Sequence, residues 1–159
     1  MYGLSKPRIF EIGVALLLTV AALVFVGWTV WAAEVAQLRV ADAWMRPTVG
    51  AGRTTAAYMT IANNGNEDDT LKSARSARAK AVELHETTMT DDGVMQMRHV
   101  EDGFVIPAGG SLILKPAGAH IMVMGLDDAL AVGDELAFTL EFARAGVIEV
   151  SIPVKADGP

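Results

Sequence analysis

Imidazole and thioether side chains are concentrated in one part of this sequence. All three histidines and five of the eight methionines lie between His85 and Met124, and the chain contains no cysteine. Neutral imidazoles and thioethers are soft ligands that suit cuprous copper, whereas calcium and magnesium prefer oxygen ligands. The composition of this segment therefore indicates a copper(I) site that is built without a thiolate.

A predicted β-hairpin would bring many of these side chains onto one sheet face. Asp91-Asp92-Gly93 fits a type I turn followed by a left-handed glycine, a common three-residue hairpin loop. Such a loop places three cross-strand pairs on the same face: Met89 with Met95, Thr87 with Met97, and His85 with His99. His85 and Met97 would then be diagonal neighbours about 7–8 Å apart, from which long side chains can reach one ion. A two-residue loop at Asp92-Gly93 would instead send the two sets to different faces.

A second segment carries the same ligand types along one strand. In His120-Ile121-Met122-Val123-Met124 the residues alternate, so His120 and Met122 project from one face while Ile121 and Val123 project from the other. If this strand lies beside the hairpin, four side chains can share one ion: His85, Met97, His120 and Met122. Thioethers bind a soft ion without losing a proton. Met95 and His99 remain alternatives or additions to Met97.

Two other groups of residues have simpler interpretations. Met45 and Met59 lie outside the cluster, and we expect them to fill gaps in the core. The acidic run Glu67-Asp68-Asp69 could be considered as a hard-cation site, but we interpret it as a solvated turn. The remaining carboxylates show no catalytic pairing pattern, so the sequence predicts no enzyme.

Residues 1–36 are predicted to be a signal peptide or a membrane anchor. Residues 12–33 carry no charge and follow Lys6, Arg8 and Glu11. As a helix this stretch would roughly match the ~30 Å hydrocarbon layer, with its basic end in the cytoplasm. Val30-Trp31-Ala32 also offers a small-residue cleavage site. Both alternatives remain open, and both export residues 37–159 to the periplasm, anchored to the inner membrane by residues 12–33 if the leader is retained.

The exported part is sized and charged for one domain that does not bind nucleic acid. Its roughly 120 residues suffice for one compact core. Without Lys6, Arg8 and Glu11 it has 11 basic and 18 acidic residues, a formal charge of −7. Nucleic acids and anionic membranes are bound mainly through lysine and arginine, so this balance argues against both. The absence of cysteine excludes disulfides, so packing alone must stabilise the fold.

The exported part has the sequence pattern of an all-β domain. Short runs rich in Val, Ile, Leu and Thr are separated by Gly, Pro, Asn and Asp. We expect eight strands, at residues 38–44, 55–62, 81–89, 94–100, 111–114, 120–126, 135–142 and 147–154. The only helical piece expected after the leader is a turn or two at residues 127–131. Short antiparallel strands in a chain of this length indicate a sandwich or a small barrel.

Several ordered sequence blocks resemble a known family. They lie at residues 42–48, 56–63, 83–87, 93–98, 106–110 and 114–126. In order, and over about residues 38–154, they resemble the periplasmic copper chaperones written PCu(A)C. The resemblance implies a cupredoxin-like antiparallel β-sandwich that holds copper(I) near its surface through a histidine, a methionine and a His-x-Met pair. By position these ligands are His85, Met97, His120 and Met122.

The sequence departs from this family at the hairpin. The intervals from His85 to Met97 and from Met97 to His120 hold 11 and 22 residues, each one more than the family's usual spacing. Glu86 lies where many members have a second methionine, and His99 where proline is more usual. These differences keep Met95 as an alternative to Met97, and His99 as a spare ligand.

The resemblance implies copper carriage without catalysis. The expected recipient is the dinuclear copper centre of a cytochrome oxidase subunit, or another copper chaperone. An electron-transfer cupredoxin would need a cysteine thiolate, which the chain lacks. A copper enzyme would need acid–base groups beside an open coordination position. The alternative from another class is an exported structural or adhesive β-sandwich with no metal role.

Overall fold

The computed structural model describes residues 37–48 and 53–158, and the leader predicted at residues 1–36 lies outside them. The described residues form ten β-strands and contain no helix long and apolar enough to cross a membrane. The predicted all-β class is therefore confirmed for this part of the chain.

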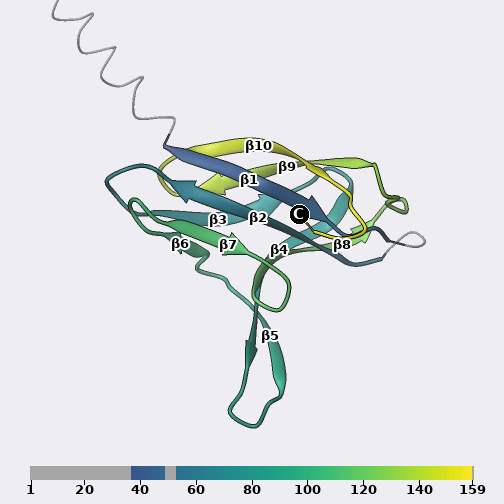
Figure 1. Cartoon of the computed structure of the whole chain (residues 1–159). Helices are drawn as coiled ribbons and strands as arrows, with labels where there is room; N and C mark the ends of the chain where they lie inside the picture. Colours follow the sequence, from purple (N-terminus) through teal and green to yellow (C-terminus); the bar gives the residue numbers. More distant parts are fainter. Residues whose placement is uncertain (1–36, 49–52, 159) are drawn as a thin grey trace, which may run out of the picture. The chain divides into compact units, whose positions relative to one another are not determined.

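The strands form two antiparallel sheets (Figure 1). The larger sheet has the order β1 (Leu38–Met45), β2 (Thr55–Asn63), β8 (Ala119–Leu126), β4 (Ala79–Met89) and β5 (Met95–His99), with β7 (Ser111–Leu114) also paired to β2. The smaller sheet has the order β10 (Gly146–Pro153), β9 (Glu135–Phe142), β3 (Asp69–Arg75) and β6 (Phe104–Ile106).

The core lies between the inner faces of the two sheets. In β9 the predicted alternation holds, because Leu136, Phe138, Leu140 and Phe142 are buried. From the larger sheet, side chains such as Ile121 of β8 pack into the same cluster. Met45 and Met59 are also almost fully buried, as predicted for core methionines. The outer face of the larger sheet is thus not part of this core.

A bulge in β1 determines which of its residues face that outer side. The pairing with β2 shifts between Ala41 and Trp44, and Asp42 has a left-handed backbone with φ of 53°. An extra residue in one strand reverses the alternation beyond it. As a result Met45 is opposite Ala57 in the core, while Trp44 is opposite Tyr58 on the outer face.

All eight predicted strands are present, with ends that differ by at most two residues, but two strands were missed. β3 begins in the acidic run and has no regular alternation. Its pairing with β9 shifts between Leu71 and Ser73, so the buried apolar residues are Leu71 and Ala74, three positions apart. A bulge of this kind removes the period-two signal on which strand prediction depends. β6 has only three residues, too few to show a period.

The prediction of a helical turn at residues 127–131 is wrong. This segment is non-helical and is tied to the loop after β1. Thr48 donates its backbone N–H to the carbonyl of Leu130 at 2.9 Å, and Leu130 donates its own N–H to the Thr48 hydroxyl at 3.0 Å. These bonds place the Leu130 side chain, which is fully buried, in the core.

The acidic run is also not simply a solvated turn. Glu67 and Asp68 are exposed, but Asp69 is only 5% exposed. Its carboxylate accepts hydrogen bonds from the backbone N–H groups of Thr70, Arg144 and Ala145 at 2.7–2.9 Å. Asp69 therefore fastens the start of β3 to the β9–β10 turn.

Candidate metal centre

The hairpin register predicted from the sequence is confirmed. Gly93 has a left-handed backbone with φ of 77°, and Thr90 donates its N–H to the Val94 carbonyl at 2.9 Å. The cross-strand pairs between β4 and β5 include all three that were expected: Met89 with Met95, Thr87 with Met97, and His85 with His99. The three-residue loop thus places the thioethers and imidazoles of the hairpin on one face.

Strand β8 lies on the other side of β4, as the site required. His120 is opposite His85, and Met122 is opposite Glu83. Residues opposite each other in antiparallel strands share a face. His120 and Met122 are therefore on the same face as His85 and Met97, although they come from distant parts of the sequence.

A row of rings crosses this face of the sheet. From β1 to β5 it contains Trp44, Tyr58, His120, His85 and His99, with successive ring centres 4.7, 6.5, 5.9 and 5.6 Å apart. Trp44 and Tyr58 are each 7% exposed and His120 only 4%. The imidazole of His120 is therefore held between rings rather than free in solvent.

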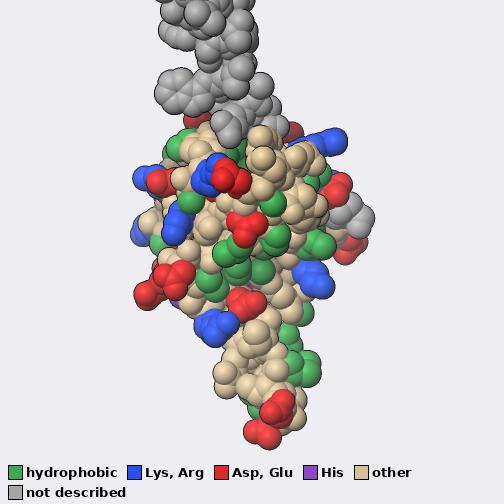
Figure 2. Space-filling model, turned by 90° about the vertical axis from the view of Figure 1, so that its left-hand side faces the viewer, with side chains coloured by type: hydrophobic (Ala, Val, Ile, Leu, Met, Phe, Trp, Pro, Cys, Tyr) green, Lys and Arg blue, Asp and Glu red, His purple; other side chains and the backbone are tan. Residues whose placement is uncertain are grey.

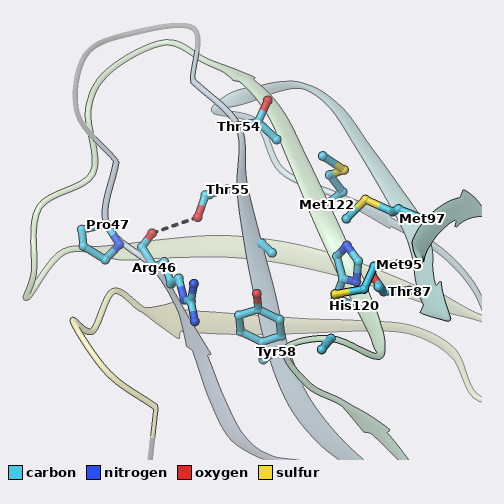
Figure 3. A pocket seen from close by; sticks show the side chains of 12 residues that line it. Arg46, Pro47, Thr54, Thr55, Tyr58, Thr87, Met95, Met97, His120 and Met122 are labelled. Atoms are coloured by element: carbon cyan, nitrogen blue, oxygen red, sulfur yellow. Dashed lines mark hydrogen bonds between the residues drawn. The ribbon is translucent and has the colours of Figure 1, made fainter. Parts of the chain in front are cut away.

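Beside this row is a hollow of about 520 Å³ (Figure 3). Sulfur-bearing side chains from two strands and the His120 ring gather on one side of it: Met95 and Met97 from β5, and His120 and Met122 from β8. The opposite wall includes Arg46, Pro47 and Thr54. Three thioethers and one imidazole thus border a space large enough for an ion and an incoming ligand.

The turn between β7 and β8 orients the His120 ring. Its Nδ1 atom is 2.9 Å from the carbonyl oxygen of Gly118, which also accepts the backbone N–H of Thr87 at 3.1 Å. A carbonyl can only accept, so we assign the ring proton to Nδ1. The Nε2 atom of His120 then carries a lone pair and can bind a metal. Ala117, in the same turn, has a left-handed φ of 59°, a strained conformation for a residue with a side chain.

His85 is oriented by a carboxylate. Its Nε2 atom is 2.9 Å from Oε2 of Glu83, which as a carboxylate accepts the ring proton. The Nδ1 atom is buried and has no hydrogen-bond partner among the described residues. An unpaired buried nitrogen is costly unless it has a further ligand. A metal ion is a suitable ligand for this lone pair, but His85 is not among the residues that line the hollow.

The separation of the two imidazoles is compatible with one shared ion. Metal–nitrogen bonds of about 2 Å allow ring centres of two imidazoles up to about 6 Å apart when the ion lies between them. The ring centres of His85 and His120 are 5.9 Å apart, near this upper limit. His85 and His120 are thus close enough to hold one ion together.

The remaining histidine and methionine candidates differ in their distance from the hollow. Met95 lies at the hollow beside Met97, and His99 stacks on His85, so both stay available as additional ligands. Met124 is opposite Ala81, outside the hollow. Among the described residues, histidines and carboxylates form no group of three that could hold a metal. The other soft donors at the hollow are the thioethers of Met95, Met97 and Met122.

Sequence reasoning missed the residues that support the ligands. Glu83 was not singled out, yet it pairs with His85. Tyr58 and Trp44 were not singled out, because the bulge at Asp42 conceals that they share a face. The signal that could have found Glu83 is its position two residues before His85, on the same side of β4.

Comparison with known proteins supplies the family. Residues 38–154 match the family model "LpqE-like: Putative lipoprotein LpqE-like". The chain belongs to the LpqE-like family. A relative from Leifsonia xyli subsp. xyli (strain CTCB07), named "Putative lipoprotein Lxx21020", is 38% identical over 118 residues, which cover 74% of this chain and 69% of the relative.

Solved structures share the fold of this LpqE-like chain. The "Copper-bound PCuAC domain from PmoF2" superposes with a TM-score of 0.63 at 20% identity, covering 77% of this chain and 95% of that one. The "Solution structure of CuI-DR1885 from Deinococcus Radiodurans" gives a TM-score of 0.58 at 31% identity, covering 78% and 84%. The fold implied by the PCu(A)C resemblance is therefore confirmed.

Proposed function

We propose that this LpqE-like chain binds copper(I) at the hollow and carries it to a partner protein. The proposed ligands are His85, Met97, His120 and Met122. The observation that carries the proposal is that these four side chains share one sheet face. Met97, His120 and Met122 line the hollow, and the ring centre of His85 is 5.9 Å from that of His120. The copper(I)-bound protein from Deinococcus radiodurans, with 31% identity and the same fold, supports it.

The ligand types select the ion. Thioethers bind copper(I) well and bind hard cations poorly, and the carboxylate of Glu83 is already paired with His85. Met97 is 54% exposed while His120 is 4% exposed. The site therefore has one firmly held side and one accessible side, so an incoming ligand can displace Met97 first.

We infer that the function is delivery without catalysis. The proposed recipient is the dinuclear copper centre of a cytochrome oxidase subunit, or another copper chaperone. Residues 1–36 would act as a signal or anchor and residues 37–159 as the copper-binding domain, which places the site in the periplasm. A retained anchor would raise the effective concentration of donor at a membrane recipient. The LpqE-like family is described as lipoprotein, which also supports export.

Anaerobic titration of the full-length chain with copper(I), in the presence of a competing copper(I) chelator, tests the proposal. We expect one tightly bound equivalent that a tenfold excess of Zn²⁺ does not displace. Addition of the isolated copper-binding domain of a cytochrome oxidase subunit should then remove the ion. Absence of a tight equivalent would leave a structural or adhesive sandwich as the better interpretation.

Replacing Glu83 with glutamine should weaken copper(I) binding by about tenfold, because carboxylates that orient a ligand histidine typically contribute 10–100-fold. Glu83 fixes the proton of His85 on Nε2 and leaves Nδ1 free. The chelator competition measures the affinity, and ¹⁵N NMR of the His85 ring reports its tautomer.

Glu86→Gln is the matched control for Glu83→Gln. Glu86 lies on the opposite face of β4, where it accepts a hydrogen bond from Arg98 at 2.8 Å. An exposed ion pair contributes little, so this change should leave both the affinity and the His85 tautomer unaltered. Equal losses in the two variants would contradict a specific role for Glu83.

A further inference from the structure

The β4–β5 hairpin carries exposed methionines beyond the proposed ligands. Figure 1 shows this hairpin projecting from the sandwich, and in Figure 2 hydrophobic side chains follow one side of the projection. Met89 is 70% exposed, Met95 55% and Met97 54%. These are among the most exposed large apolar side chains in the described part of the chain.

Packing in the hydrophobic core does not explain why these methionines lie on one face of the hairpin. Every residue from Asp91 to His99 is exposed, so neither face of the outer hairpin packs against the sandwich. The other face is polar, with Glu86 opposite Arg98 and Thr88 opposite Gln96. A hairpin with both faces in water gains little stability from thioethers on one of them.

The geometry of the hairpin brings Met89 and Met95 close together. Val100 donates its N–H to the Leu84 carbonyl, which identifies His85 and His99 as a non-hydrogen-bonded pair. Pairs alternate along the ladder, so Met89 and Met95, four residues farther out, are of the same type. In such pairs the side chains are at their closest, with Cα atoms about 4.5 Å apart. Two flexible thioethers at this spacing can bind one ion.

The pair is also continuous with the proposed copper site. Met95 lines the hollow together with Met97, His120 and Met122. At the other end, the loop carries the exposed carboxylates of Asp91 and Asp92, next to Met89, and Figure 2 shows acidic side chains at the end of the projection. Their negative potential raises the local concentration of a cation.

We propose that Met89 and Met95, here called the outer pair, form a second, weaker copper(I) site through which the ion enters or leaves the hollow. The inference rests on the proposed function, since it adds a place for the same cargo. With two thioethers and no imidazole, the outer pair binds copper(I) at least about 100-fold more weakly than the four-ligand site. A weak, exposed site exchanges its ion rapidly with a partner, while the inner site prevents its loss.

The test is ¹³C-methyl methionine NMR on the full-length chain with copper(I) added anaerobically. During the first equivalent the methyl signals of Met97 and Met122 should move, and during the second those of Met89 and Met95. In a Met89→Leu variant, which leaves Met95 in the wall of the hollow, the first equivalent should bind with an affinity within about twofold of the original, and the second should be lost. Leucine keeps the size of the side chain and removes the sulfur.

Met124→Leu is the matched control, because it removes a thioether from the same sheet face outside the hollow. It should retain both equivalents. The proposal of the outer pair would be contradicted if the Met89 and Met95 signals did not move at two equivalents, or if the second equivalent still bound to the Met89→Leu variant. Failure of the inner site is seen separately, as a missing first equivalent. In a His120→Ala, Met122→Ala background the outer pair should still respond to copper(I).

Discussion

Replacing His120 and Met122 together with alanine should weaken copper(I) binding more than about 1,000-fold, because the loss of a ligand costs more than the 10–100-fold typical of residues that only orient one. These two side chains line the hollow, and the hydrogen bond between His120 Nδ1 and the Gly118 carbonyl orients the ring whose Nε2 atom is the proposed ligand. The anaerobic chelator competition measures the loss directly.

The fold should survive this double replacement. His120 and Met122 lie on the outer face of the larger sheet, and neither belongs to the buried cluster between the sheets. The buried His120 ring contacts Tyr58 and His85, so its removal should lower the unfolding midpoint by a few degrees only. Far-ultraviolet circular dichroism with thermal unfolding checks this expectation.

Met124→Ala provides the comparison on the same strand and the same face. It should keep the affinity of the original chain, because Met124 lies outside the hollow. If the double variant unfolds, the copper(I) affinity of Met122→Leu alone tests the site, since this change keeps the side-chain volume and removes only the sulfur. If copper(I) still bound tightly to a chain without the Met122 sulfur and the His120 ring, the proposed site would be wrong.

The parts of the fold with regular alternation could be predicted from the sequence. The Asp91-Asp92-Gly93 loop determines the hairpin register, because only the left-handed glycine at position 93 allows the three-residue turn. The alternation of His120 and Met122 then determines their shared face. Local sequence patterns were thus sufficient to predict that these side chains share one sheet face.

The features that interrupt alternation could not be predicted. Bulges at Asp42 and between Leu71 and Ser73 reverse the faces of β1 and β3, and they depend on pairing with distant strands. The first bulge determines that Trp44 covers Tyr58 beside His120. The burial of Asp69 likewise depends on a turn more than 70 residues away. A local pattern contains no information about such partners.

Asp69→Ala should destabilise the domain by about 2–4 kcal/mol, because hydrogen bonds to a buried charged group are among the strong ones and their loss leaves donors unpaired. The Asp69 carboxylate accepts the N–H groups of Thr70, Arg144 and Ala145, and no water can readily replace it at 5% exposure. Urea unfolding of the full-length chain measures the free-energy change, and thermal unfolding should shift by about 10 °C.

Asp68→Ala is the neighbouring control. Asp68 is exposed and its carboxylate accepts one hydrogen bond, from the N–H of Ala108 at 2.8 Å. Water can take over that bond, so we expect a loss below about 1 kcal/mol. Copper(I) affinity should be unchanged in both variants, because Asp69 belongs to the smaller sheet while the hollow belongs to the larger one. Equal destabilisation by the two changes would mean that the buried carboxylate does not fasten β3 to the β9–β10 turn.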